Sequence, residues 1–112
     1  MNHLKDIKIT ILNGKWTVQL DREQSGGWCA FPRRVIMIGT DPSMTKEMLK
    51  HNITHEITHA MQAELGQWQN VIRNGKSDDS FDSEFIAEFM AIHGEYILKL
   101  SKSLLKEIIA VK

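Results

Sequence analysis

Apolar and polar residues alternate in two short stretches near the start of the chain. Residues 7–12 read Ile-Lys-Ile-Thr-Ile-Leu and residues 16–20 read Trp-Thr-Val-Gln-Leu, and this period of two is typical of β-strands with one buried face. Asn13-Gly14 between them is a dipeptide that favours a tight turn. The pattern therefore predicts a β-hairpin over residues 7–20.

A third apolar run, Arg-Val-Ile-Met-Ile-Gly at residues 34–39, predicts another strand. The stretch before it, residues 21–33, is polar and contains Gly26-Gly27 and the chain-breaking Pro32. We therefore predict that residues 21–33 form a loop.

Beyond these strands the apolar spacing changes to that of a helix. Asp41-Pro42 is suited to a helix N-cap followed by proline at the first helical position, and Gly66 is suited to a helix end. The sequence therefore predicts a helix over residues 43–65. The apolar side of this helix would comprise Leu49, Ile53, Ile57 and Ala60.

A second apolar stripe with helical spacing begins after Ser83. It predicts a helix over most of residues 83–110, either continuous or broken at Gly94 or Ser101. Residues 67–82 before it predict a short helical turn and then a polar connection. The stripe comprises Phe85, Ile86, Phe89, Met90, Ile97, Leu100, Leu104 and Ile108.

This order of elements predicts an α+β fold in a single domain spanning residues 1–112. We expect a small three-stranded sheet, made of the hairpin and an edge strand, with both long helices packed on one face.

The composition is that of an ordinary globular protein, with 42% apolar and 25% charged residues. Lysine and arginine together number 14, as do aspartate and glutamate, so no excess of positive charge indicates a nucleic acid partner. No long apolar run at the N-terminus indicates a signal peptide or a membrane helix. The one cysteine, Cys29, excludes an intramolecular disulfide and fits a reducing compartment, so we expect a cytoplasmic protein.

Residues 55–59 read His-Glu-Ile-Thr-His, an HExxH pentapeptide inside the first predicted helix. With about 100° and 1.5 Å per residue, His55 and His59 project within roughly 40° of each other and about 6 Å apart. Two imidazoles so placed can bind one metal ion, and Glu56 lies near enough to act on a water molecule bound to it. Such a short motif also occurs by chance, and two histidines can simply belong to a solvated face. The apolar residues on the opposite side of the helix favour instead a buried element whose polar side faces a cleft.

A catalytic zinc ion commonly has three protein ligands and one open position. Glu84 and Glu88 share one face of the second predicted helix, about 40° apart, and Phe85, Phe89 and Met90 place apolar surface beside them. Exposed carboxylates at a helix start are an ordinary feature, but carboxylates within an apolar stripe need a partner. With the histidines upstream, we expect one glutamate to bind the metal and the other to accept the free ring N–H of a ligand histidine.

The motif at residues 55–59, followed by Ser-Glu-Phe-Ile-Ala-Glu at residues 83–88, resembles the gluzincin metallopeptidases, the thermolysin-like group. In that family HExxH on one helix is followed by ExxxD on the next. The order of elements resembles the family's minimal core, particularly small metallopeptidases encoded by prophages and mobile elements, and the strand at 34–39 resembles its edge strand. The resemblance covers roughly residues 28–95. A metzincin would instead have glycine and histidine where Gln62 and Leu65 stand.

The resemblance implies a zincin-like fold and a Zn²⁺ ion held by His55, His59 and Glu84. It also implies that Glu56 is the general base and that Glu88 takes the place of the family's aspartate beside a ligand histidine. Because glutamate is one methylene longer than aspartate, Glu88 is an alternative metal ligand. The implied reaction is hydrolysis of a peptide bond, in which zinc lowers the pKa of its bound water and polarises the carbonyl.

Residues for the other catalytic tasks are less clearly marked. Tyr96, the only tyrosine, is a candidate transition-state stabiliser, although a packed ring is the simpler interpretation. Arg73 is a similar candidate and His93 a weaker one. Cys29 could bind the zinc as an inhibitory thiolate or be a buried structural cysteine, of which the structural role is commoner. Trp28 suits packing better than a substrate pocket.

The sequence therefore predicts a zinc-dependent metalloendopeptidase acting on a peptide or protein substrate, which the strand at 34–39 could bind by strand addition. Because so short a chain leaves little material for a substrate pocket, a zinc-binding interaction module of weak activity that needs a partner is the alternative. A structural zinc site with all four positions filled is a third interpretation. Neither nucleic acid nor a membrane is expected as a partner. The apolar stripe of the second helix predicts packing against the sheet or, alternatively, contact within a homodimer.

Overall fold

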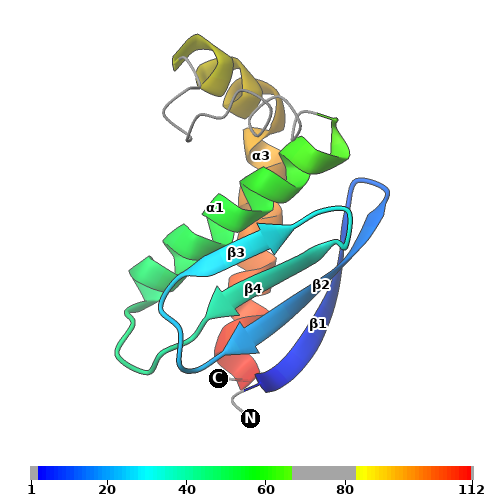
Figure 1. The fold of residues 1–112 in the computed structure, drawn as a ribbon. Helices are drawn as coiled ribbons and strands as arrows, with labels where there is room; N and C mark the ends of the chain where they lie inside the picture. The colour runs from blue at the N-terminus through cyan, green and yellow to red at the C-terminus, as the bar shows by residue number, and fades with distance from the viewer. Residues whose placement is uncertain (1–2, 67–82, 112) are drawn as a thin grey trace.

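The computed structural model describes the backbone at residues 3–66 and 83–111, and the side chains at residues 6–66 and 89–111. Over these residues the chain is α+β, as predicted, with a four-stranded mixed sheet and two long helices (Figure 1). The predicted short helical turn and polar connection at 67–82 lie outside the described residues. The elements are, in chain order, β1 (His3–Ile11), β2 (Gly14–Asp21), β3 (Gly27–Ala30), β4 (Val35–Gly39), α1 (Lys46–Glu64) and α3 (Ser83–Val111).

The strands lie in the order β1-β2-β4-β3. β1 and β2 form the predicted antiparallel hairpin, β4 runs parallel to β2, and β3 pairs antiparallel with β4. The hairpin turn comes one residue earlier than predicted, because Ile11 pairs with Gly14 and Leu12 takes the left-handed conformation with a φ of 56°. Gly14 is required for packing instead, since a Cβ atom there would collide with the carboxylate of Glu64.

Two predictions for the sheet are wrong. The predicted loop at 21–33 contains β3, so the described sheet has four strands and not three. As a result β4, the predicted edge strand, lies in the interior between β2 and β3. The glycine pair at 26–27 predicts a loop, but Gly27 is part of a strand and its lack of a side chain allows close packing. A Cβ atom there would lie 2.7 Å from the carbonyl oxygen of Met37.

α1 begins and ends close to the predicted positions. Its N-cap is Thr45, whose side-chain oxygen accepts a hydrogen bond from the backbone N–H of Met48 at 3.1 Å. The predicted cap, Asp41, instead accepts bonds from the backbone N–H and the hydroxyl of Ser43, both at 2.8 Å, and stabilises a turn before the helix. At the other end Gly66 has a φ of 77°, the left-handed conformation that ends many helices.

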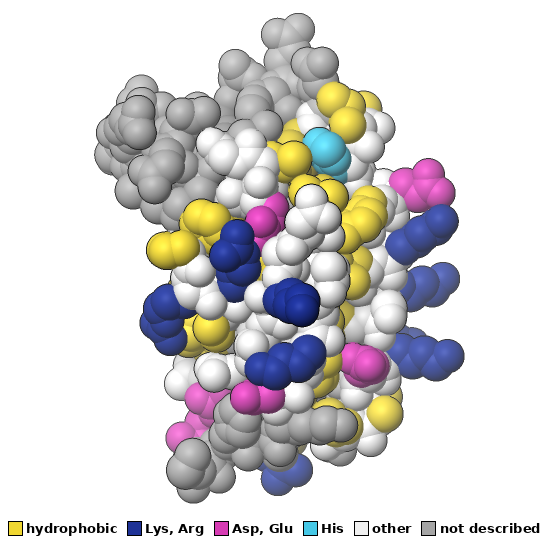
Figure 2. Space-filling view, turned by 90° about the vertical axis from the view of Figure 1, so that its right-hand side faces the viewer, with side chains coloured by type: hydrophobic (Ala, Val, Ile, Leu, Met, Phe, Trp, Pro, Cys, Tyr) yellow, Lys and Arg dark blue, Asp and Glu magenta, His cyan; other side chains and the backbone are white. Residues whose placement is uncertain are grey.

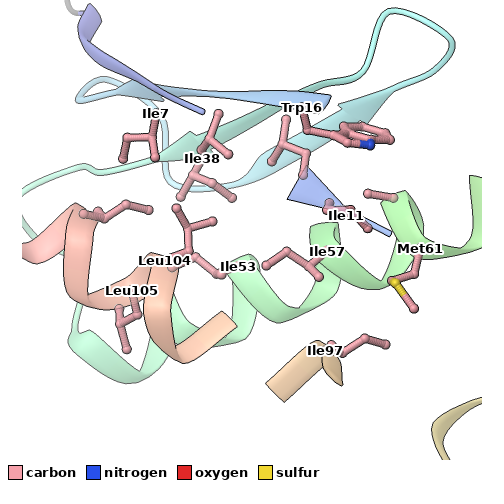
Figure 3. Close-up of a cluster of buried hydrophobic side chains, with 14 of the residues drawn as sticks. Ile7, Ile11, Trp16, Ile38, Ile53, Ile57, Met61, Ile97, Leu104 and Leu105 are labelled. Carbon is pink, nitrogen blue, oxygen red and sulfur yellow. The ribbon is translucent and has the colours of Figure 1, made fainter. Parts of the chain in front are cut away.

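α3 is continuous from Ser83 to Val111, without a break at Gly94 or Ser101. Both helices cover the same face of the sheet and turn their apolar sides toward it (Figure 1 and Figure 3). Ile97, Leu104 and Ile108 are buried in this shared core, so these positions of the α3 stripe pack within the chain. Neither α1 nor α3 carries an apolar stretch that would reach across a lipid bilayer. The largest fully buried side chains are Trp16, Ile11, Leu20, Ile36, Ile38, Leu49, Ile53, Ile57, Met61, Ile97, Leu104 and Ile108.

Candidate functional site

α1 has one apolar side and one polar side, as its sequence predicts. The polar side carries His51, His55 and His59 at intervals of four residues, with their rings in succession along the helix. The core therefore fixes the helix that presents the histidines. The apolar side is buried beneath the sheet and comprises Leu49, Ile53, Ile57 and Ala60.

The two histidines of the HExxH motif face one another. The Nε2 atoms of His55 and His59 are 3.1 Å apart, and their ring planes meet at 81°. Two nitrogen ligands of a tetrahedral zinc ion, each about 2.0–2.1 Å from the metal, would be about 3.3–3.4 Å apart. The same spacing suits a hydrogen bond between the rings, in which one proton stands where the metal would stand. The observed separation of 3.1 Å is thus about 0.2–0.3 Å shorter than the one that zinc requires, so a small outward turn of the rings would admit the ion.

A glutamine one turn further along α1 fixes one of these rings. The Nδ1 atom of His59 lies 3.2 Å from Oε1 of Gln62, a side chain that is only 5% exposed. In the tautomer that carries its proton on Nδ1, His59 donates to this amide oxygen and its Nε2 lone pair is directed toward His55. Such a partner for the second ring nitrogen is typical of metal-binding histidines. Sequence reasoning missed this role, although the spacing of three residues places Gln62 beside His59 on a helix.

Glu56 faces the edge of the sheet. Its side chain is only 6% exposed, and a Cβ atom on Gly27 would lie 3.3 Å from both its Cγ and its Oε2. One turn earlier on α1, Asn52 donates a hydrogen bond to the backbone carbonyl of Ser25 at 2.9 Å. α1 therefore packs against the start of β3. The carboxylate of Glu56, the residue after His55 in the sequence, lies beside that strand.

The thiol of Cys29 lies near this carboxylate. Burial, and to a lesser degree the negative charge of Glu56, raises the pKa of Cys29 to about 12. At neutral pH the thiol is therefore protonated, and it is the thiolate that binds metals. These surroundings favour a structural cysteine over an inhibitory zinc ligand.

The strand beside Glu56 is β3, whereas the sequence predicts the strand at 34–39 as the one that binds a substrate. Residues 34–39 were predicted to offer a free edge to a substrate, but β4 is paired on both sides, with β2 and with β3. In the described part of the chain, the free edge on this side of the sheet belongs to β3. The proposed strand-addition site must therefore move from β4 to β3.

The ladder between β3 and β4 shows which backbone groups this edge offers. The N–H of Gly39 donates to the carbonyl of Gly26 at 2.7 Å, and hydrogen-bonded pairs recur at every second residue of an antiparallel ladder. Trp28 is the next β3 residue bonded toward β4, so the N–H and C=O groups of Gly27 and Cys29 point to the free edge. These groups can pair with an added strand.

Two other candidates make contacts of a structural kind. The hydroxyl of Tyr96 accepts a hydrogen bond from the N–H of Leu12 at 2.9 Å and donates one to the carbonyl of Thr10 at 3.4 Å. These bonds tie α3 to the hairpin turn, so the geometry gives no support to Tyr96 as a transition-state stabiliser. The ring of His93 packs on that of Phe89, with their centroids 4.9 Å apart.

The third metal ligand falls outside the described side chains. Glu84 and Glu88 stand in the first two turns of α3, but only their backbone is described, and Arg73 is not described at all. Among the side chains at residues 6–66 and 89–111, no group of three histidines, cysteines or carboxylates gathers around one point. The ligand beyond His55 and His59 thus stays a prediction.

A polar cluster holds the C-terminal end of α1 against the sheet. Glu64 accepts hydrogen bonds from Nε of Arg34 at 2.6 Å and from Nε1 of Trp16 at 2.7 Å. The Arg34 guanidinium also lies over the ring of Phe31, 5.1 Å from its centroid. The bond from Arg34, together with the bond from Trp16, lowers the pKa of Glu64 against the opposing effect of burial. This cluster anchors α1 just beyond His59 and so keeps the histidines in place relative to β3.

Comparisons of this chain with protein-family models, with curated proteins and with solved structures found no match. The function is therefore inferred from the chemistry of the site itself.

Proposed function

We propose that this protein is a zinc-dependent hydrolase that cleaves peptide bonds, with His55 and His59 as metal ligands and Glu56 as general base. The observation that carries this proposal is the facing pair of Nε2 atoms, 3.1 Å apart. The residue after His55, Glu56, is a buried carboxylate. The contact between His59 and the buried Gln62 supports the proposal, because the tautomer that donates from Nδ1 to Gln62 presents the lone pair of Nε2 to a metal. Histidines of a merely solvated face would not need such an acceptor.

The residues of the site have separate tasks in this reaction. Zinc bound by His55 and His59 would supply a water molecule of lowered pKa and polarise the scissile carbonyl. Glu56 would accept a proton from that water on its carboxylate and deliver it to the leaving amine. The burial of Glu56 against β3 suits this task, because a carboxylate held by its surroundings needs no reorganisation during the reaction.

The remaining metal position is assigned from the likeness to the gluzincin pattern. We infer that Glu84 is the third ligand and that Glu88 accepts the ring N–H of a ligand histidine. Both stand near the start of α3, the helix that packs against α1. Glu88 stays the alternative ligand, since its longer side chain can reach the metal as well as a histidine. A zincin-like arrangement of the two helices belongs to the same proposal.

An extended peptide is the substrate that the site suits best. The free edge of β3 offers the backbone groups of Gly27 and Cys29, and the carboxylate of Glu56 lies beside this edge. A peptide added to β3 as a further strand would therefore pass close to the general base. Main-chain hydrogen bonds would supply its affinity. We further propose that the protein works in the cytoplasm, as a monomer or a homodimer.

The experiment that tests this function compares zinc-loaded wild type with Glu56→Gln on a mixture of quenched fluorescent peptides. We expect both proteins to hold zinc, and the variant to lose hydrolysis by at least about 10²-fold. A chelator should abolish the wild-type activity and added zinc should restore it. Unchanged turnover in Glu56→Gln would remove the proposed mechanism.

The assignment of the third ligand has its own measurement. Zinc stoichiometry is determined for Glu84→Ala and Glu88→Ala separately, and we expect Glu84→Ala alone to lose the metal. Equal zinc binding by the two variants would contradict the assignment.

A zinc-binding interaction module with little hydrolytic activity is the second candidate. It is supported by the contacts of Tyr96, whose hydroxyl is bonded to Leu12 and Thr10 on the hairpin, because these bonds give no support to a role as oxyanion stabiliser. Wild-type protein that binds one zinc ion but hydrolyses none of the peptides would identify this function.

A further inference from the structure

The two edges of the sheet differ in charge. β1 carries Asp6 and Lys8, and charged side chains on an edge strand oppose pairing with another chain. β1 lies at the right of Figure 1, so Figure 2 views the molecule from this side, and Lys and Arg side chains project from the surface there. β3 reads Gly-Trp-Cys-Ala and carries no charge. An uncharged edge that exposes an aromatic residue invites pairing, so β3 is the edge suited to receive a strand.

Trp28 is the side chain that an added strand would meet on the open face of the sheet. Side chains alternate along a strand; Gly27 and Cys29 face α1, whereas Trp28 faces the opposite side of the sheet. Trp28 pairs with Met37 and Met37 pairs with Gln19, so these three residues form a row across the sheet. Trp28 stands at the end of the row nearest the free edge and is 41% exposed.

We propose that the edge of β3 selects peptides by the side chain that lies opposite Trp28, and that it favours an aromatic or β-branched residue there. The inference rests on the proposed binding of a peptide to this edge. Residues directly opposite on antiparallel strands have Cβ atoms about 4.5–5.5 Å apart, and pairs of an aromatic with an aromatic or β-branched residue are favourable. A large apolar side chain at this position would also cover the exposed indole ring.

The surface around Trp28 has room for such a side chain. A hollow of about 340 Å³ lies on the open face, lined by Trp28, Met37, Gln19 and Gln24 and by Leu20 and Asp21 at the end of β2. By the strand order this hollow lies on the inner side of Trp28, away from the free edge. A long side chain on the added strand can therefore cross the indole ring and place its tip in the hollow.

Because side chains alternate along the added strand, the residue opposite Trp28 lies on the other face of the sheet from Glu56. The two neighbours of the selected residue lie opposite Gly27 and Cys29, bond to their backbone groups and turn their side chains toward α1, where Glu56 lies. Trp28 therefore acts on the affinity of the peptide and not on the chemical step. We expect Trp28→Ala to raise KM for a preferred peptide while kcat stays unchanged.

The experiment measures peptide affinity on zinc-loaded Glu56→Gln, in which binding is read without turnover. A serine-rich decapeptide carries one tyrosine or valine, moved through every position, and is compared with alanine at the same position. We expect one position at which tyrosine and valine bind about two- to fivefold more tightly than alanine. This preference should vanish when Trp28→Ala is added and persist with Trp28→Phe, the matched control that keeps an aromatic ring.

A second readout locates the selected position independently. N-methylation removes a backbone donor, so it should weaken binding at the two positions opposite Gly27 and Cys29 and spare the position between them. The spared position should be the one at which tyrosine is preferred. The inference would be overturned if tyrosine were preferred at a position other than the spared one, or if N-methylation did not weaken binding at alternate residues of the peptide.

The outcomes separate this inference from the proposed function. A preference that survives Trp28→Ala, no preference at all, or no peptide binding would each overturn the inference. Preference that depends on Trp28, in a protein whose wild type hydrolyses no peptide, would keep the inference and remove the hydrolase. Hydrolysis that depends on Glu56 but does not change in Trp28→Ala would keep the hydrolase and remove the inference.

Discussion

The Nδ1 atom of His59 lies 3.2 Å from the side-chain oxygen of Gln62, three residues further along α1. In the tautomer that donates from Nδ1 to this oxygen, the Nε2 lone pair of His59 faces His55, 3.1 Å away. Gln62 is not part of the HExxH pentapeptide. A residue outside the motif thus orients one of its two histidines.

Removal of this acceptor should weaken zinc binding. Gln62→Ala is expected to bind zinc about 10–100-fold less tightly than wild type, because the ring of His59 loses the partner that fixes its orientation. Competition with a zinc-chelating dye measures the change. Gln62→Glu keeps an acceptor at the same place and should bind zinc nearly as well as wild type. If Gln62→Ala and wild type had equal affinities, the contact would have no part in metal binding.

A methyl group on β3 should disturb the general base without removing the metal. The Cβ atom of Gly27→Ala would lie 2.7 Å from the carbonyl oxygen of Met37 and 3.3 Å from Cγ and Oε2 of Glu56, so the strand or the carboxylate must shift. A displacement of about 1 Å near the chemistry can lower turnover about 10²-fold. We expect that loss in peptide hydrolysis at unchanged zinc content.

Gly26→Ala is the matched control for this variant. A Cβ atom at Gly26 meets no other atom within 4 Å, so turnover should stay close to that of wild type. Equal turnover in the two alanine variants would show that the contact between Gly27 and Glu56 does not position the base.

The cluster of Glu64, Arg34 and Trp16 should stabilise the fold in a pH-dependent way. The bond from Arg34 holds the pKa of Glu64 below its ordinary value of 4.5, so the unfolded chain takes up the proton more readily than the folded one. The stabilisation is therefore present above pH 4.5 and is lost as the pH falls through the lower pKa of the folded state. Glu64→Gln should unfold at lower denaturant concentration than wild type at neutral pH, and the difference should shrink in acid. A difference that does not change with pH would contradict a role for the charge.

Cys29 should react slowly in the folded protein. Its pKa of about 12, against an ordinary 9.0, keeps it protonated at pH 8. Alkylation by iodoacetamide should then be about 10²-fold slower than in the unfolded chain, since only the thiolate reacts and a more basic thiolate is somewhat more nucleophilic. The stabilisation linked to the protonated thiol is present below pH 9.0 and is lost as the pH rises toward 12. Labelling of native protein at the unfolded rate would contradict this environment.

The histidine-bearing side of α1 could be predicted from the sequence because its geometry is local. Residues four apart on a helix share one side whatever surrounds them, so His55 and His59 were placed together before any tertiary contact was known. The hairpin of β1 and β2 was predictable for the same reason, since each strand shows its own alternation. These features needed only neighbours in the chain.

β3 could not be predicted in this way, because its identity depends on distant contacts. It is four residues long, begins with a glycine, and is stabilised by pairing with β4 and by packing against Glu56. So short a segment shows no clear alternation of apolar and polar residues. Its glycine is typical of a loop, and the nearby carboxylate of Glu56 helps to explain why a side chain is absent there. Without β3 in the predicted sheet, β4 was expected at the free edge, which belongs to β3 in the structure. Gln62 was missed because a buried acceptor is recognised only when its histidine is seen beside it.

The most direct test of the account is a crystal structure of the protein with zinc bound. We expect zinc about 2.0–2.1 Å from Nε2 of both His55 and His59, bonded also to the carboxylate of Glu84. The fourth position should hold a water molecule within hydrogen-bond distance of Glu56. Zinc with four protein ligands, or zinc bound away from the two histidines, would contradict the account.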